Sequence, residues 1–259
     1  MKCYIVGNWK MNFTTGEASI YLHKIQKKYR PVRGLEVVVA PSAVSLQPLS
    51  LQLERQKSKI KLAAQNVAAQ DYGAYTGEIS ANQLRGIAKY VIIGHSERRY
   101  LFHERDKVIK MKVAAALRSN ITPIICIGET DNERSFGETA DVIRDQLLAA
   151  LTDVSKEDLK KVIIAYEPVW AISTSSKNSR LAGPDDVAAA IDLIRRELQY
   201  LAGEEMASKI PVLYGGSVTP DNAGAYLTIP GVNGLLIGNS SLILSRFIGI
   251  IEIAKRVKS

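Results

Sequence analysis

Short apolar runs alternate along the chain with longer segments in which apolar residues recur every three or four positions. Most of the runs are nearly continuous in apolar residues, which is typical of parallel strands that are covered on both faces. The runs predict eight strands, at residues 3–7, 37–40, 60–64, 90–94, 122–127, 162–166, 210–214 and 234–238.

The segments between these runs have the spacing of amphipathic helices, with charged residues between the apolar ones. They predict helices at residues 17–30, 104–119, 134–151, 185–201 and 241–257. Turn sequences such as Gly183-Pro184 and Thr219-Pro220-Asp221 mark helix boundaries, because proline can open a helix behind a short polar loop.

The number of strand–helix units indicates the fold class. Eight such units within 259 residues are typical of a closed (β/α)8 TIM barrel, an α/β fold. Composition does not shift along the chain, so we predict a single domain over residues 1–259. An open, doubly wound sheet is the alternative that the same pattern allows.

Composition narrows the class of protein. Hydrophobic residues make up 46% of the chain, which is enough for a sizeable core. The sequence contains no run of about eighteen apolar residues and no amino-terminal secretion signal, so we expect no membrane partner. Cys3 and Cys126 fall within predicted strands and are expected to be reduced core residues, which favours a cytoplasmic location.

The net charge of +8 raises the question of a nucleic-acid partner. Basic residues cluster at residues 24–33 and again at 55–61. Both clusters belong to predicted outer helices and turns without a pattern of aromatic stacking platforms, so solvated helical faces explain them better. We therefore expect no nucleic-acid partner, although a basic protein attracts small anionic substrates.

Polar residues follow most of the predicted strands, and a parallel barrel carries its active site at the carboxyl ends of its strands. The most informative stretch runs from 163 to 170, where a β-branched run ends on Glu167 and breaks at Pro168. Partial desolvation of a carboxylate at this position suits a general base. The other strands end in Asn8-Trp9-Lys10, Gln65-Asn66, His95-Ser96-Glu97, Glu129, Gly215-Gly216-Ser217 and Gly238-Asn239-Ser240.

The small residues after the seventh and eighth strands predict a phosphate site, because backbone N–H groups there can point at an anion. The sequence has no P-loop, dinucleotide fingerprint, metal-ligand motif or nucleophile elbow, so we expect neither cofactor nor metal. A base, an imidazole and a phosphate site suit proton transfer beside the carbonyl of a small phosphorylated sugar. A retro-aldol lyase is the alternative if Lys10 forms a Schiff base.

Four motifs, in this order, resemble those of the triosephosphate isomerase family: Gly7-Asn8-Trp9-Lys10-Met11-Asn12, Ile93-Gly94-His95-Ser96-Glu97-Arg98-Arg99, Ala165-Tyr166-Glu167-Pro168-Val169-Trp170 and Tyr214-Gly215-Gly216-Ser217. The resemblance covers essentially the whole chain, with further agreement at residues 64–66, 75–80 and 126–130. It implies a TIM barrel that interconverts D-glyceraldehyde 3-phosphate and dihydroxyacetone phosphate through an enediol, without a cofactor.

The resemblance also implies roles for the catalytic residues. Glu167 would move the proton between the two carbons, and His95 would donate to the substrate oxygens. Lys10 would stabilise the developing negative charge, and Asn8 would orient the substrate.

Supporting groups and a partner follow from the same resemblance. Ser96 and Glu97 would support the site. Backbone groups would hold the phosphate at Ser173, Ser217, Gly238 and Asn239. Family members are usually homodimers, which implies contact between two copies through the loop at residues 70–78.

Two departures from the family pattern concern the phosphate site. The sixth loop usually reads A-I-G-T-G-K, whereas here it reads Ala171-Ile172-Ser173-Thr174-Ser175-Ser176-Lys177 and is longer before Gly183. In the eighth loop Asn239 replaces a glycine, and asparagine is the residue that best tolerates a positive φ after glycine. We expect an active isomerase with altered loop closure. The alternatives are a catalytically impaired phosphate-sugar-binding barrel and a moonlighting surface protein that uses its basic helices.

Overall fold

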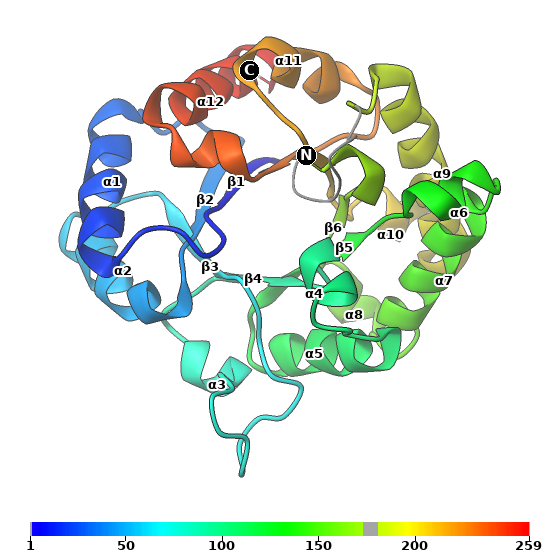
Figure 1. Ribbon diagram of the computed structural model, residues 1–259, viewed down its shortest axis with the longest axis horizontal. Helices are drawn as coiled ribbons and strands as arrows, with labels where there is room; N and C mark the ends of the chain where they lie inside the picture. Colours follow the sequence, from blue (N-terminus) through cyan, green and yellow to red (C-terminus); the bar gives the residue numbers. More distant parts are fainter. Residues whose placement is uncertain (1, 173–180, 259) are drawn as a thin grey trace.

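A computed structural model describes residues 2–172 and 181–258, and the strands in it form one closed barrel with helices outside it (Figure 1). The strands, in barrel order, are β1 (Cys3–Asn8), β2 (Leu35–Ala40), β3 (Lys61–Ala64), β4 (Tyr90–Ile93), β5 (Thr122–Ile127), β6 (Ile163–Tyr166), β7 (Val212–Gly216) and β8 (Gly234–Ile237). Every pair of neighbours is parallel, and β8 pairs with β1. The predicted (β/α)8 barrel is therefore confirmed, and the open sheet is wrong.

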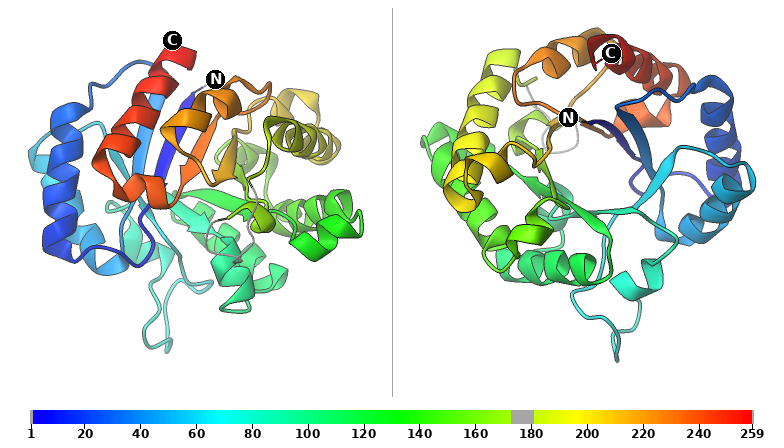
Figure 2. Two further views of the ribbon diagram at one scale, coloured as in Figure 1. Left: turned by 45° about the horizontal axis from the view of Figure 1, so that its top comes forward. Right: turned by 180° about the vertical axis from the view of Figure 1, so that it is seen from behind.

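Helices surround the barrel on all sides (Figure 2). They are α1 (Thr15–Lys28), α2 (Ala43–Arg55), α3 (Ala81–Leu84), α4 (Ser96–Tyr100), α5 (Asp106–Arg118), α6 (Asp131–Ser135), α7 (Thr139–Leu151), α8 (Lys156–Leu159), α9 (Pro184–Ala202), α10 (Glu204–Ala207), α11 (Pro220–Thr228) and α12 (Leu244–Lys258), with 3-10 turns η1 (Val169–Ala171) and η2 (Asn239–Leu242). Within the described residues, no helix is both long and apolar enough to cross a membrane.

Several of these helices differ from the prediction. The sequence pattern did not predict α2, which contains Pro48 in its interior, or the short helix α11. The single helix predicted over 134–151 is wrong, because Gly137, with a φ of 77°, separates α6 from α7. The helix predicted over 241–257 begins later, at Leu244, after the turn η2.

The core has two parts, because alternate residues of each strand face opposite sides of the barrel wall. Val6 packs inside the barrel, whereas Ile5 packs between the strands and the helices. Cys126 belongs to the inner cluster and Cys3 to the outer one, and both are buried free thiols, as predicted.

A charged cluster closes the amino-terminal end of the barrel, opposite the predicted site. Glu36 of β2 is 8% exposed and accepts hydrogen bonds from Lys2 at 2.5 Å, from Lys89 at 2.7 Å and from the hydroxyl of Tyr90. Burial raises the pKa of Glu36, but these hydrogen bonds outweigh burial and lower it to about 2. These partners allow a carboxylate inside β2, which begins two residues before the predicted strand because Leu35 and Glu36 pair with Cys3 and Tyr4 of β1.

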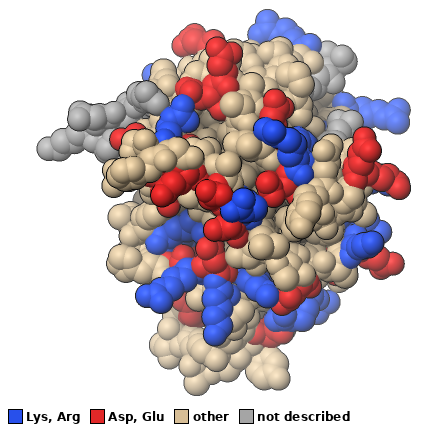
Figure 3. Space-filling model, turned by 90° about the vertical axis from the view of Figure 1, so that its right-hand side faces the viewer, with Lys and Arg blue, Asp and Glu red and all other residues tan. Residues whose placement is uncertain are grey.

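Charged side chains cover the outer helices. On the side built from α6, α7 and α9, basic and acidic side chains are interspersed (Figure 3), and they form ion pairs such as Arg134–Asp186 and Arg144–Asp141, both at 2.6 Å. The basic residues at 24, 27 and 28 lie exposed along α1, as expected for a solvated helical face.

Candidate active site

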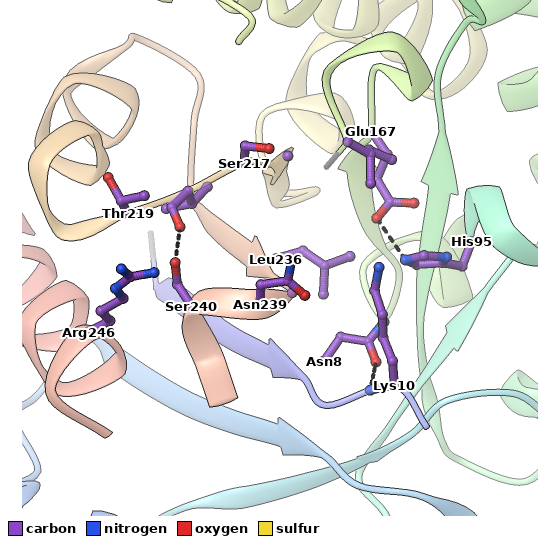
Figure 4. Close-up of a pocket in the computed structure, with 14 residues that line it drawn as sticks. Asn8, Lys10, His95, Glu167, Ser217, Thr219, Leu236, Asn239, Ser240 and Arg246 are labelled. Carbon is purple, nitrogen blue, oxygen red and sulfur yellow. Dashed lines mark hydrogen bonds and ion pairs between the residues drawn. The ribbon is translucent and has the colours of Figure 1, made fainter. Parts of the chain in front are cut away.

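One pocket at the carboxyl ends of the strands collects most of the predicted site residues (Figure 4). Its lining includes Asn8, Lys10, His95, Glu167, Ser217, Gly238 and Asn239. The pocket volume of about 170 Å³ lies below the range of about 300–1,000 Å³ that is typical of drug-sized ligands. The pocket therefore suits a small substrate.

The backbone places Glu167 by close packing. Its N–H donates to the carbonyl of Ile127 at 2.7 Å, directly after β6 ends. A Cβ at Gly128 would lie 2.1 Å from the Glu167 carbonyl oxygen, and a Cβ at Gly215 would lie 2.8 Å from Glu167 Cγ. Only glycine at these two positions leaves room for Glu167, whose residue exposure is 5%.

The carboxylate of Glu167 faces the histidine. Glu167 Oε1 lies 3.3 Å from His95 Nε2, and Oε2 accepts the N–H of Ser96 at 3.4 Å. Cys126 lies close by, and burial, with the negative charge of Glu167 adding to it, raises the pKa of the Cys126 thiol well above its usual range. The predicted supporting residue Ser96 thus contacts the Glu167 carboxylate through its backbone N–H.

The backbone of α4 fixes the tautomer of His95. His95 caps this helix, and its Nδ1 accepts the N–H of Glu97 at 3.2 Å. An Nδ1 that accepts a hydrogen bond carries no hydrogen, so the ring hydrogen is on Nε2. The imidazole therefore presents a donor to the pocket.

Lys10 is held in an unusual backbone conformation, with a φ of 52°. Its N–H donates to Asn8 Oδ1 at 3.1 Å, and its carbonyl accepts from Gln65 Nε2 at 2.8 Å. Lys10 Nζ pairs with the Glu97 carboxylate at 2.6 Å. These contacts maintain a strained backbone and direct the ammonium into the pocket.

The end of the pocket predicted to bind phosphate is built by the loops after β7 and β8. The Ser217 hydroxyl donates to the carbonyl of Ala171 at 3.0 Å, and the Ser241 hydroxyl donates to the carbonyl of Gly238 at 2.7 Å. Asn239 opens η2 and is not among the described residues with a positive φ, so tolerance of that conformation does not explain its presence. Ser173, the remaining predicted phosphate residue, lies outside the described residues.

Comparison with known proteins identifies the family. The family model of triosephosphate isomerase matches residues 3–254. Triosephosphate isomerases from Dehalococcoides mccartyi and Carboxydothermus hydrogenoformans are each 41% identical, over 95% and 97% of this chain and 94% and 98% of their own lengths. The chain belongs to the triosephosphate isomerase family.

The solved structures agree with this assignment. The crystal structure of triosephosphate isomerase from Bartonella henselae matches with a TM-score of 0.86 and 38% identity, covering 98% of this chain and all of the other. The isomerase activity that the sequence predicted is confirmed at the level of the family. Membership of this family does not favour either alternative from the sequence, the catalytically impaired binding barrel or the moonlighting surface protein.

Glu129, which follows β5, does not face the pocket as Glu167 does after β6. It is fully buried and accepts hydrogen bonds from Trp170 Nε1 at 2.8 Å and from the Tyr166 hydroxyl at 3.1 Å. Burial raises the pKa of Glu129. Glu129 thus anchors η1 through Trp170 and does not line the described pocket.

Sequence reasoning missed several pocket residues. Ile172, Thr219, Leu236 and Arg246 also line the pocket, as does Ser240, which the sequence placed at a strand end without assigning it a role. Arg246 belongs to α12 and lies eight positions after Gly238. From the sequence alone it would be taken for an exposed residue on a surface helix. Within 2–172 and 181–258, no group of three or more His, Cys, Asp or Glu side chains could hold a metal ion.

Proposed function

We propose that Glu167, His95 and Lys10 carry out the isomerisation of D-glyceraldehyde 3-phosphate and dihydroxyacetone phosphate. The observation that supports this most directly is the contact of 3.3 Å between Glu167 Oε1 and His95 Nε2, in a pocket that continues to Ser217 and Asn239. A candidate base and a hydrogen-bond donor thus face one another at one end of the pocket, and the loops after β7 and β8 form its other end.

The reaction follows from these positions. Glu167 takes a proton from the carbon beside the carbonyl, and the electron pair of the C–H bond forms the C=C bond of an enediolate. The carbonyl oxygen takes the negative charge, which the Nε2–H of His95 and the ammonium of Lys10 stabilise. A proton then passes from the hydroxyl on the deprotonated carbon to the former carbonyl oxygen, by way of the His95 imidazole. Glu167 returns its proton to the former carbonyl carbon, the deprotonated carbon becomes the new carbonyl, and no external oxidant is required.

Substrate entry must separate Glu167 from His95, because the present contact leaves no atom between them. The carboxylate also gives up the 3.4 Å bond from the Ser96 N–H, which is long for a hydrogen bond. The structure therefore supports a base that moves between two positions. Asn8, whose side chain also holds the Lys10 backbone, would orient the substrate, and backbone groups of Ser217, Gly238 and Asn239 would bind its phosphate.

A matched pair of substitutions tests the role of the base. Glu167→Gln keeps the shape of the side chain and removes the proton acceptor, so kcat should fall by at least about 10²-fold. Glu157→Gln, on the exposed surface of α8, should keep the activity of the unmodified chain. Equal turnover by the two variants would exclude Glu167 as the base.

Altered closure of the sixth loop stays a prediction, because residues 173–180 lie outside the described part of the chain. Poor closure would let the enediolate lose its phosphate and release methylglyoxal. The ratio of methylglyoxal to isomerised product measures this directly. A variant with glycine restored at Ser173 and Ser175 should lower the ratio, and an unchanged ratio would contradict the prediction.

We also propose a homodimer that forms through the loop at residues 70–78. This loop projects from the barrel next to α3 (Figure 1), and its Tyr72 and Tyr75 are 88% and 48% exposed. A second pocket beside Lys10 and His95 is lined by Met11, which is 96% exposed, and by Phe102, which is 64% exposed. Exposed apolar groups of this kind mark protein interfaces.

The oligomeric state of two tyrosine variants tests the dimer. Tyr72→Asp should give a monomer in sedimentation experiments, because a carboxylate would be buried in the interface. Tyr200→Asp changes a residue of equal exposure, 87%, on α9, and should leave the dimer intact. A monomeric unmodified chain would overturn the proposal.

Two further proposals concern the whole chain. The closed barrel from β1 to β8 supports one domain over residues 1–259. The buried free thiols of Cys3 and Cys126 support a reducing, cytoplasmic location, which fractionation of the source cells would test.

A further inference from the structure

Arg246 is a cation of the active-site pocket that the proposed mechanism does not use. It lies in the first turn of α12 and lines the same pocket as Lys10, His95 and Glu167. In Figure 4 it stands at the opposite end of the pocket from Lys10, beside Thr219 and Ser240. The pocket therefore has a positively charged group at each end.

Helix stability does not account for Arg246. The first turn of α12 contains no acidic residue, and the positive end of the helix dipole opposes a cation at this position. Arg246 is exposed, and it forms no hydrogen bond or ion pair with any residue in 2–172 or 181–258. Its charge is thus available to an anion.

Carboxylates offset much of the remaining positive charge in the pocket. Lys10 is paired with Glu97 at 2.6 Å, and Glu167 adds a further carboxylate to the lining. Among the described lining residues, Arg246 is the cation without a carboxylate partner. A phosphate dianion that approaches the pocket is therefore attracted mainly from the side of α12.

We propose that Arg246 is the residue that captures the substrate phosphate at the end of the pocket lined by Thr219 and Ser240. This inference rests on the proposed function and adds a specificity-determining residue to it. A guanidinium is suited to a phosphate, because its planar donors match two phosphate oxygens. Arg246 stands apart from Glu167 and His95 (Figure 4), so it acts on capture of the substrate and not on proton transfer.

Substitutions at two arginines distinguish phosphate capture by Arg246 from a general effect of the protein's net charge. Arg246→Gln and Arg246→Glu are compared with Arg33→Gln and Arg33→Glu, because Arg33 is exposed in the loop before β2 at the opposite end of the barrel. For Arg246→Gln we expect kcat/KM for D-glyceraldehyde 3-phosphate to fall about two- to fivefold, as for the loss of one exposed ion pair, while kcat changes less. Arg246→Glu should lower kcat/KM further.

Two measurements distinguish loss of phosphate capture from a structural change of the pocket caused by the substitution. The inhibition constant for inorganic phosphate should rise in parallel with KM, and both differences should shrink as salt screens the charge. The kcat/KM for phosphate-free D-glyceraldehyde should change less than that for the phosphate ester. Equal losses on both substrates, or equal effects at Arg246 and Arg33, would overturn the inference.

Failure of the proposed function would give a different result. In that case the unmodified chain would show no turnover in the same assay. Calorimetric titration with inorganic phosphate would still decide the role of Arg246, since weaker binding by the Arg246 variants alone supports capture and unchanged binding refutes it.

Discussion

Replacing Gly215 with alanine should move the carboxylate of Glu167, the proposed base, without otherwise altering the barrel. The added Cβ would lie 2.8 Å from Glu167 Cγ and 3.3 Å from its Oε1. Ordinary contact between carbon atoms requires about 3.5–4.0 Å, so the Glu167 side chain must shift by roughly 1 Å. The φ of Gly215 lies outside the left-handed region, so its backbone accepts alanine.

A displacement of this size at the reacting group should lower kcat about 10²-fold. Overpacking of the same site should lower the free energy of unfolding by only about 1–3 kcal/mol. Gly16→Ala is the control, because a Cβ there meets nothing within 4 Å, and alanine in α1 should keep the activity and stabilise the helix slightly.

The assay is steady-state turnover in both directions, together with urea unfolding of the three proteins. A Gly215→Ala protein with the kcat of the unmodified chain would refute the reasoning, since the position of Glu167 would then not matter. A loss of kcat that only accompanied an unfolded protein would also refute it.

The two remaining predictions concern stability. Ionised Glu36, with its pKa lowered to about 2 from 4.5, stabilises the fold above about pH 4.5, and this contribution of at most about 3 kcal/mol is lost as the pH falls toward 2. Glu36→Gln should therefore flatten the acid side of the stability curve, and an unchanged slope in urea unfolding would contradict the assignment. Burial lowers the pKa of Lys112, which is 4% exposed and pairs with Glu104 at 2.5 Å. Lys112→Met should cost about 1–3 kcal/mol, because the buried Glu104 carboxylate loses one of two charged partners and keeps Arg98 at 2.6 Å, and an unchanged free energy of unfolding in the same assay would contradict it.

The sequence predicted the parts of the site that depend on strand ends. Glu167 directly follows an apolar run, and His95 and Lys10 follow two others, so the barrel order alone brings them to one mouth. Their proximity could be expected because parallel strands in a closed barrel all point their carboxyl ends the same way. The contact distances and the tautomer of His95 required the structure.

Other features depend on contacts between distant residues and could not be predicted. Glu36 sits inside a strand because Lys2 and Lys89, from separate segments, pair with it. Arg246 reaches the pocket through the path of η2, which sequence spacing does not determine. The positive φ of Lys10 likewise depends on Gln65 from another strand end, and only its contacts reveal it.

The most direct test of the account is the interconversion of D-glyceraldehyde 3-phosphate and dihydroxyacetone phosphate by the purified chain and by its Glu167→Gln variant. The account predicts rapid turnover by the chain and a loss of at least about 10²-fold in the variant, with phosphate binding retained. Absence of turnover in the unmodified chain, with inorganic phosphate still bound, would contradict the proposed function.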